Sequence, residues 1–201
     1  MTFDDLLPYI LPHAKACPES IALLNARLAV VELCEKARVW KDYQSGVDTV
    51  ADTTAYAYAP AEGQRVVELL EVTLEGIDVP VVTPKIGRSR MRCGESGPYV
   101  FGTLIGFELH PAQAEDMEIL TYSVVAPTRA ATTIPDAFER FAEGIAQGAL
   151  ARLLADKDKA WSDPNGAVVA ASRWSQALAT AQGKAFDGHA QVVHRTRAHW
   201  F

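Results

Sequence analysis

The reactive side chains of this sequence are dispersed, and one short segment has the residue types of a nucleophile site. Cys93-Gly94-Glu95-Ser96-Gly97 is similar to the nucleophile elbow of serine hydrolases, but its spacing is GxSG rather than GxSxG. We also expect it between two strands, whereas an elbow needs a strand-to-helix turn. A hydrolase that uses Ser96 with an unidentified histidine is therefore the third of the three hypotheses below.

The histidines and cysteines do not have the spacing of a metal site. His13 and Cys17 lie four residues apart, which suits one helical face, but no second pair of ligands follows them. The remaining candidates recur every five residues and share no face of a helix or strand: His189, His194 and His199. We therefore expect no metal, no cofactor and no catalytic residue, so that the protein is not an enzyme.

A basic segment, KIGRSRMR, is the first of two candidate binding features. Neither GxxxxGK[ST] nor GxGxxG is present, and a formal net charge of −6 argues against broad nucleic-acid binding. The segment is either a solvated hairpin tip or a contact for DNA phosphates or an acidic neighbouring subunit. Its basic residues are Lys85, Arg88, Arg90 and Arg92.

The second feature is the C-terminal stretch, which has neither a helical stripe nor a turn signal. We expect residues 188–201 to be an extended tail, with residue types that are enriched at interface hot spots. The alternatives are a disordered terminus or a strand that joins the chain's own sheet. The tail residues expected to bind a partner are Arg195, Arg197, His199, Trp200 and Phe201.

Composition predicts a folded protein of one domain, or of one domain with an insertion. Of the 201 residues, 49% are hydrophobic and 22% are charged, so a substantial core is expected. No apolar run is long enough to cross a membrane, and we expect synthesis in the cytoplasm. The cysteines Cys17, Cys34 and Cys93 cannot all pair with one another, which indicates a reducing compartment.

The stretch from Thr133 to Phe186 predicts a helical hairpin. Asp136 and Glu139 have the spacing of a capping box for the first helix, and Asp163-Pro164 is a typical start for the second. Two glycines inside the first helix each cost about 1 kcal/mol relative to alanine, so they indicate either a backbone that comes very close or slack in a stable helix. The residues expected to pack the hairpin are Gly144, Gly148, Trp161, Asp163, Pro164 and Trp174.

The preceding chain predicts one long helix and then strands. The helix should span 19–43, with its apolar stripe on Ile21, Leu24, Leu28 and Val31. Residues 47–127 are rich in β-branched and aromatic residues and predict antiparallel strands. Among these strands we expect 65–74, 99–110 and 117–126, with 111–116 as the turn between the last two.

Together these elements predict an α+β fold. Its core is a three-helix bundle, made of the long N-terminal helix and the C-terminal hairpin, with an inserted antiparallel β-domain and an extended C-terminal tail. The expected boundaries are 1–45 for the N-terminal segment and long helix, 46–130 for the β-domain, 131–187 for the hairpin and 188–201 for the tail.

Three segments of the sequence follow one family pattern: FELHPAQAEDMEILTYSVVAPT, IPDAFERFAEGIAQGALARLL and AWSDPNGAVVAASRWSQALATA. They resemble the head-to-tail adaptor (head-completion or connector) proteins of short-tailed bacteriophages, and the resemblance extends from about Ser20 to the end. The segment KIGRSRMRCGESG has no counterpart in the family pattern.

The resemblance implies a structural protein of the virion neck. Such adaptors form a ring of probably twelve copies below the capsid portal protein, complete the head after DNA packaging, and receive the tail nozzle or tail-tube protein. Packaged DNA passes through the ring, and no membrane is involved. The C-terminal tail, here Arg195 to Phe201, would bind the portal. The alternative is a small nucleic-acid or ligand-binding module that uses the β-insert and its basic loop.

Overall fold

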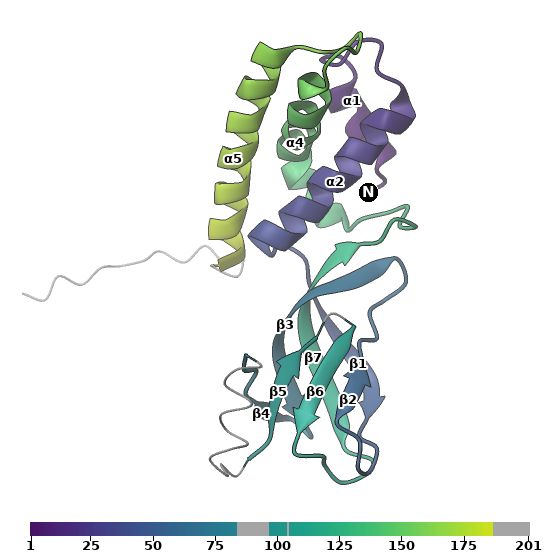
Figure 1. Cartoon of the computed structure of the whole chain (residues 1–201), viewed down its shortest axis with the longest axis vertical. Helices are drawn as coiled ribbons and strands as arrows, with labels where there is room; N and C mark the ends of the chain where they lie inside the picture. The colour runs from purple at the N-terminus through teal and green to yellow at the C-terminus, as the bar shows by residue number, and fades with distance from the viewer. Residues whose placement is uncertain (84–96, 104, 187–201) are drawn as a thin grey trace, which may run out of the picture. The chain divides into compact units, whose positions relative to one another are not determined.

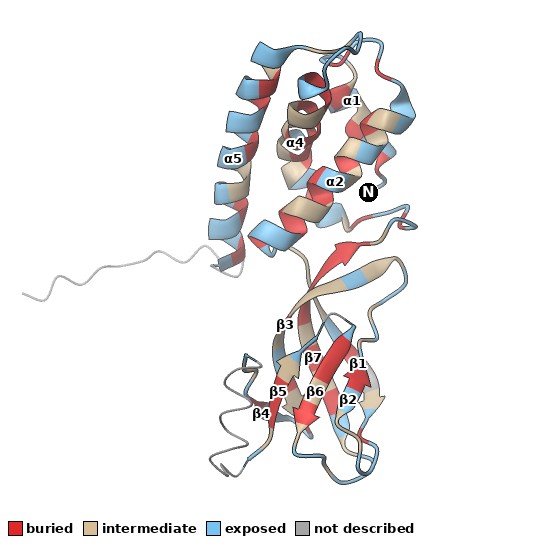
Figure 2. Ribbon diagram, viewed as in Figure 1, coloured by how far each residue is buried: buried red, intermediate tan, exposed pale blue. Residues whose placement is uncertain are grey.

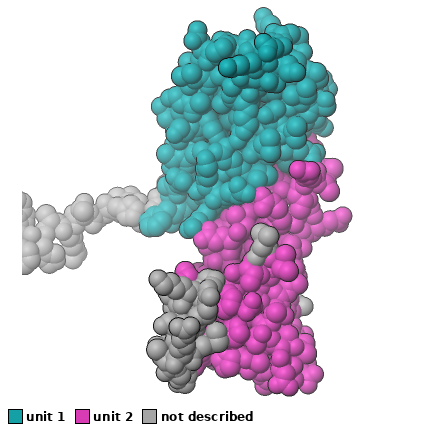
Figure 3. Space-filling view, in the orientation of Figure 1, with its two compact units in different colours: residues 1, 3–39, 136–201 teal, residues 2, 40–135 magenta. Residues whose placement is uncertain are grey.

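The computed structural model describes residues 1–83, 97–103 and 105–186 (Figure 1). These residues form two compact units, which Figure 3 colours separately. The helical unit comprises residues 1, 3–39 and 136–201, and the β-unit comprises residues 2 and 40–135.

The helical unit is built around α4 (Ala142–Ala155). This helix contacts α5 (Pro164–Phe186), α2 (Glu19–Ala37) and α1 (Leu7–Ile10). Short 3-10 helices precede α1 and α4, at Asp4–Leu6 and Asp136–Phe141. Most side chains of α4 are buried, as the red segments of Figure 2 show. They include Ile145, Ala149 and Leu153, which are at most 2% exposed.

The predicted three-helix-bundle core is wrong. The described residues form an α+β protein with four α-helices and two antiparallel sheets, and only α5, with 23 residues, exceeds 20 residues. The N-terminal helix has 19 residues and ends at Ala37 instead of Tyr43. Arg38 adopts a left-handed conformation (φ 54°), and its N–H caps the helix by donating to Cys34 O at 3.0 Å.

The predicted start of the first hairpin helix is also wrong. Asp136 and Glu139 lie in the 3-10 helix, and α4 begins only at Ala142. The Asp136 carboxylate pairs with the N-terminal amino group of Met1. In contrast, α5 begins at Pro164, as Asp163-Pro164 predicted.

The strands of the β-unit form two antiparallel sheets. The larger has the order β1-β7-β3-β4, and the smaller has the order β2-β6-β5. Residues from both sheets form one hydrophobic core, in which Phe107, Leu109 and Ile119 are at most 1% exposed. The bounds are β1 Lys41–Asp48, β2 Ala55–Ala57, β3 Gln64–Leu74, β4 Ile77–Val79, β5 Tyr99–Gly102, β6 Gly106–His110 and β7 Glu118–Pro127.

Two strand predictions are confirmed, and one is wrong. β3 and β7 lie where the β-branched runs predicted them, and Glu75-Gly76 forms the turn after β3 with positive φ at both residues. The run 99–110 is not one strand, because it folds back at Thr103, whose N–H donates to Gly106 O at 2.7 Å. The resulting strands β5 and β6 pair with each other.

The predicted pairing across residues 111–116 is wrong as well. β6 belongs to the smaller sheet and β7 to the larger, so this short connection joins two sheets instead of two neighbouring strands. The close approach of β2 to β6 explains Gly106, since a Cβ atom there would lie 2.0 Å from the Tyr56 carbonyl oxygen. Only glycine fits at that point of the ladder.

Candidate interaction surfaces

The two predicted binding features lie outside the described residues. These are the basic segment, with Lys85, Arg88, Arg90 and Arg92, and the tail, with Arg195, Arg197, His199, Trp200 and Phe201. Cys93 and Ser96 of the elbow-like segment also lie outside. The described surfaces therefore come from the helical hairpin, α2 and the two sheets.

The structure brings three of the predicted hairpin residues together. A Cβ atom on Gly148 of α4 would lie 2.8 Å from the Trp174 indole of α5 and 3.1 Å from Ala29 Cβ of α2. A Cβ atom on Gly144 would lie 2.8 Å from Ala177 Cβ. The glycines thus accept side chains of neighbouring helices, and Trp174 fills the space over Gly148.

The other predicted hairpin residues lie at the turn before α5. Asp163 precedes the helix, and its N–H donates to Leu154 O at 2.9 Å. Pro164 is the first helical residue. Trp161 is half-buried, and its indole Nε1 is buried without a hydrogen-bond partner among the described residues.

Glu32 connects the three long helices, and the sequence did not reveal this role. Its Oε2 accepts a hydrogen bond from Trp174 Nε1 at 3.1 Å and another from Arg152 Nη2, while Lys36 pairs with its Oε1. Arg152 Nη1 also donates to Gly148 O at 2.6 Å. Burial opposes ionisation of Glu32, but the hydrogen bonds from Lys36, Trp174 and Arg152 and the Arg152 charge lower the pKa of its carboxyl overall. Two of these partners, Arg152 on α4 and Trp174 on α5, lie far from Glu32 in the sequence. No local sequence pattern therefore predicts these contacts.

A cavity of about 190 Å³ lies beside this network. Trp174, Gly144 and Ala177 line it, together with the acidic Glu143 and the basic Arg140 and Lys184. The remaining lining residues are Leu33, Phe141 and Thr180. The cavity therefore suits an apolar group that carries a charge, but no cluster of chemical groups for catalysis surrounds it.

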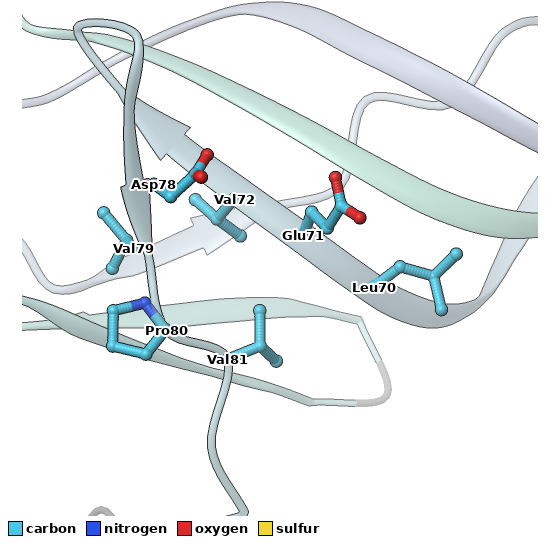
Figure 4. A pocket seen from close by; sticks show the side chains of 7 residues that line it. All are labelled: Leu70, Glu71, Val72, Asp78, Val79, Pro80 and Val81. Atoms are coloured by element: carbon cyan, nitrogen blue, oxygen red, sulfur yellow. The ribbon is translucent and has the colours of Figure 1, made fainter. Parts of the chain in front are cut away.

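The β-unit has a larger cavity of about 340 Å³, between β3 and the segment that follows β4 (Figure 4). Its lining is apolar except for Glu71 and Asp78, whose carboxylates point to the same side in Figure 4. Its other residues are Leu70, Val72, Val79, Pro80 and Val81. With two carboxylates and no basic residue in its described lining, this cavity is unsuited to phosphate.

A histidine–carboxylate pair lies on the smaller sheet. His110 Nε2 is 3.2 Å from Glu108 Oε2, and the imidazole stacks on Tyr99 and Phe101 with ring centroids 5.7 and 5.6 Å apart. In residues 1–83, 97–103 and 105–186, no group of three His, Cys, Asp or Glu residues could hold a metal ion. Nor does the described part of the chain contain a helix that is long and apolar enough to cross a membrane.

Comparison with known protein families gives a match. The model of the family described as SU10 adaptor protein covers residues 1–198, nearly the whole chain. No curated protein matches the sequence. Because the family match includes both compact units, the chain belongs to the SU10 adaptor protein family and is a structural adaptor protein of a bacteriophage, a component of the virion.

Proposed function

We propose that this protein joins the capsid portal to the tail nozzle or tail tube, and that it completes the head after DNA packaging. The match to the adaptor family over residues 1–198 carries this proposal. In its detailed form, the protein assembles as a ring, probably of twelve copies, in the neck of the virion. Packaged DNA passes through the ring, and the partners are the portal protein, the tail component and neighbouring copies.

The tail is the proposed portal-binding segment. It follows α5, the last helix of the described residues, and it carries the aromatic and basic residues that are enriched at interface hot spots. Deletion of residues 199–201 should abolish portal binding and leave the denaturant midpoint of the folded chain unchanged. A truncated chain that binds the portal normally would overturn this assignment.

Light scattering tests the proposed function directly. The mass of the chain is measured alone and then after mixing with the portal protein encoded beside it. One copy per portal subunit in the joint complex supports the adaptor ring. If the chain does not bind the portal protein, the proposed function is contradicted.

The alternative function, a nucleic-acid or ligand-binding module in the β-unit, has less support. The described cavity of that unit is lined by Glu71 and Asp78 and would repel phosphate. A role for the basic segment in DNA contact stays a separate proposal. It predicts DNA binding that weakens steeply with salt and is lost when Arg88, Arg90 and Arg92 are replaced by glutamine.

A further inference from the structure

Helix α2 is apolar on two opposite faces. Its inner face, with Ala22, Ala26, Ala29 and Leu33, is at most 1% exposed. On the outer face, Leu24 is 56% exposed and Leu28 is 47% exposed. Together with the half-buried Ile21 and Val31, these residues follow steps of three, four and three, and we call them the α2 stripe.

A helix that is apolar on all sides is normally buried on all sides. A single exposed leucine is ordinary, but an aligned stripe on a helix whose other face is already packed is not. This stripe is the apolar face that the sequence predicted for the core. The structure places the alanine face there instead, so the α2 stripe stays available for another molecule.

A second apolar patch lies on α5. Val168 is 71% exposed and Val169 is 52% exposed, and we call these two residues the α5 patch. Figure 2 shows exposed residues along the side of α5 that faces away from α4. The neighbouring Ala167 and Ala170 are buried and belong to the inner face. The helical unit thus carries two different apolar patches on two helices.

The charges near the two patches are complementary. The only charged residues of α5 are Arg173 and Lys184, both basic. Glu35 follows the α2 stripe four residues after Val31, and Arg173 follows the α5 patch four residues after Val169. At about 1.5 Å per residue, each charge lies roughly 6 Å beyond its apolar neighbour. Two parallel helices can therefore match the apolar residues and the opposite charges at once.

We propose that the α2 stripe of one copy binds the α5 patch of the next copy. Because the two patches differ, the contact is head-to-tail, which is the geometry that generates rings. The inference rests on the proposed function only in requiring several copies in contact. It goes further by naming the two surfaces that meet.

The charges disfavour the symmetric alternative, in which two α2 stripes pair with each other. An antiparallel pair centred between Leu24 and Leu28 would offer Glu35 no basic residue of the partner's stripe, whose four residues are apolar. It would also leave the α5 patch exposed. In the head-to-tail contact, Glu35 and Arg173 attract each other.

Cysteine cross-linking of the full chain distinguishes the two arrangements. Val31→Cys is introduced in one tagged chain and Val169→Cys in a differently tagged chain, because the charge match places these two residues opposite each other; both chains carry Cys93→Ser, and the native Cys17 and Cys34 are buried. After mild oxidation of the concentrated mixture, we expect a disulfide between the two differently tagged chains. Each variant alone should stay uncross-linked, because the reach of a disulfide is short.

Equilibrium sedimentation measures the strength of the contact. Leu28→Asp or Val169→Asp should weaken self-association about tenfold or more, because a charge replaces an apolar side chain in the contact. Ile77→Asp is the matched control, since Ile77 is 70% exposed but lies in the β-unit. Glu35→Arg and Arg173→Glu should each weaken association, and the double variant should restore it in part.

Three results would overturn the inference: cross-linking of the Val31→Cys chain with itself, absence of cross-links in all mixtures, or a chain that stays monomeric. If the chain binds the portal and Leu28→Asp does not change its self-association, the inference is also overturned. The proposed function is not affected by that result. A chain that associates through this contact but does not bind the portal supports the inference and contradicts the proposed function.

Discussion

The two compact units differ in the kind of polar side chain that their cores contain. In the helical unit, the charged Glu32 accepts hydrogen bonds from Trp174 and Arg152 and connects three helices. In the β-unit, the buried polar side chains are uncharged: Thr49 accepts a hydrogen bond from the Met117 N–H at 2.8 Å, whereas Gln44 and Ser123 have no side-chain hydrogen-bond partner in the described part of the chain. A buried water is the usual partner for such groups.

This difference shows how each core specifies its structure. The helical core uses small residues and one satisfied polar network, so its helices fit in one arrangement. The β-unit depends mainly on apolar packing between residues of its two sheets. The predictions below test this contrast, from the largest expected effect to the smallest.

Trp174→Ala should have the largest effect. It removes a side chain that is 7% exposed and leaves the Glu32 carboxylate without its indole donor. We expect a loss of about 3–5 kcal/mol in the free energy of unfolding, measured with urea and circular dichroism. Phe186→Ala on the same helix is the control, because Phe186 is 90% exposed and should change stability by about 0.5 kcal/mol at most. Equal midpoints for the two variants would refute the central role of Trp174.

Gly106→Ala tests the packing of the β-unit. The new Cβ atom would lie 2.0 Å from the Tyr56 carbonyl oxygen, which is backbone and cannot rotate away. We expect a loss of about 3 kcal/mol, at the upper end of overpacking costs. Gly102→Ala is the comparison, since its Cβ atom would meet Tyr58 Oη at 3.0 Å and should cost less. A chemical denaturation series that ranks the two variants in the opposite order would contradict the register of β2 and β6.

Gly148→Ala should destabilise the helical unit by about 1–2 kcal/mol, because the Trp174 indole and Ala29 leave no space for a methyl group. The same substitution at Gly183 of α5 should have the opposite sign. Nothing lies within 4 Å of a Cβ atom there, so alanine should stabilise the helix by about 0.5–1 kcal/mol. Thermal melts of both variants measure the difference. Two shifts in the same direction would mean that helix propensity, not close packing, decides these positions.

The pH dependence of Glu32 should have the smallest effect. Its pKa in the folded chain lies below the ordinary value of 4.5, so its ionised form stabilises the fold above about pH 4.5. That contribution is lost as pH falls through the lowered pKa. It should be about 1 kcal/mol or less, because the side chain keeps 21% of its exposure. Urea midpoints between pH 6 and pH 3 should therefore fall less steeply for Glu32→Gln than for the unchanged chain. Glu143→Gln, at an exposed position of α4, should leave the slope unaltered.

The sequence predicted elements whose signals are local. Asp163-Pro164 marked the start of α5, and β-branched runs marked β3 and β7. It failed for α2, because both faces of this helix are apolar and the larger side chains are on the outside. It failed for residues 99–110, because Gly102 and Gly106 interrupt an otherwise continuous strand pattern.

The candidate surfaces were less predictable than the elements. Glu32 has no local signal, because its partners Arg152 and Trp174 are 120 and 142 residues away in sequence. Only the tertiary fold brings such residues together. The glycines of α4 were noticed because glycine is costly inside a helix, but the indole that covers Gly148 had no local signal.

The order of the two units along the chain has a consequence for protein engineering and evolution. Apart from Thr2, the β-unit is one continuous stretch, 40–135, and the helical unit is interrupted there. Loops and strands inside this stretch can change length without altering the sequence of any helix. The β-unit is thus the natural region in which to graft a tag, exchange a module or find variation between viruses.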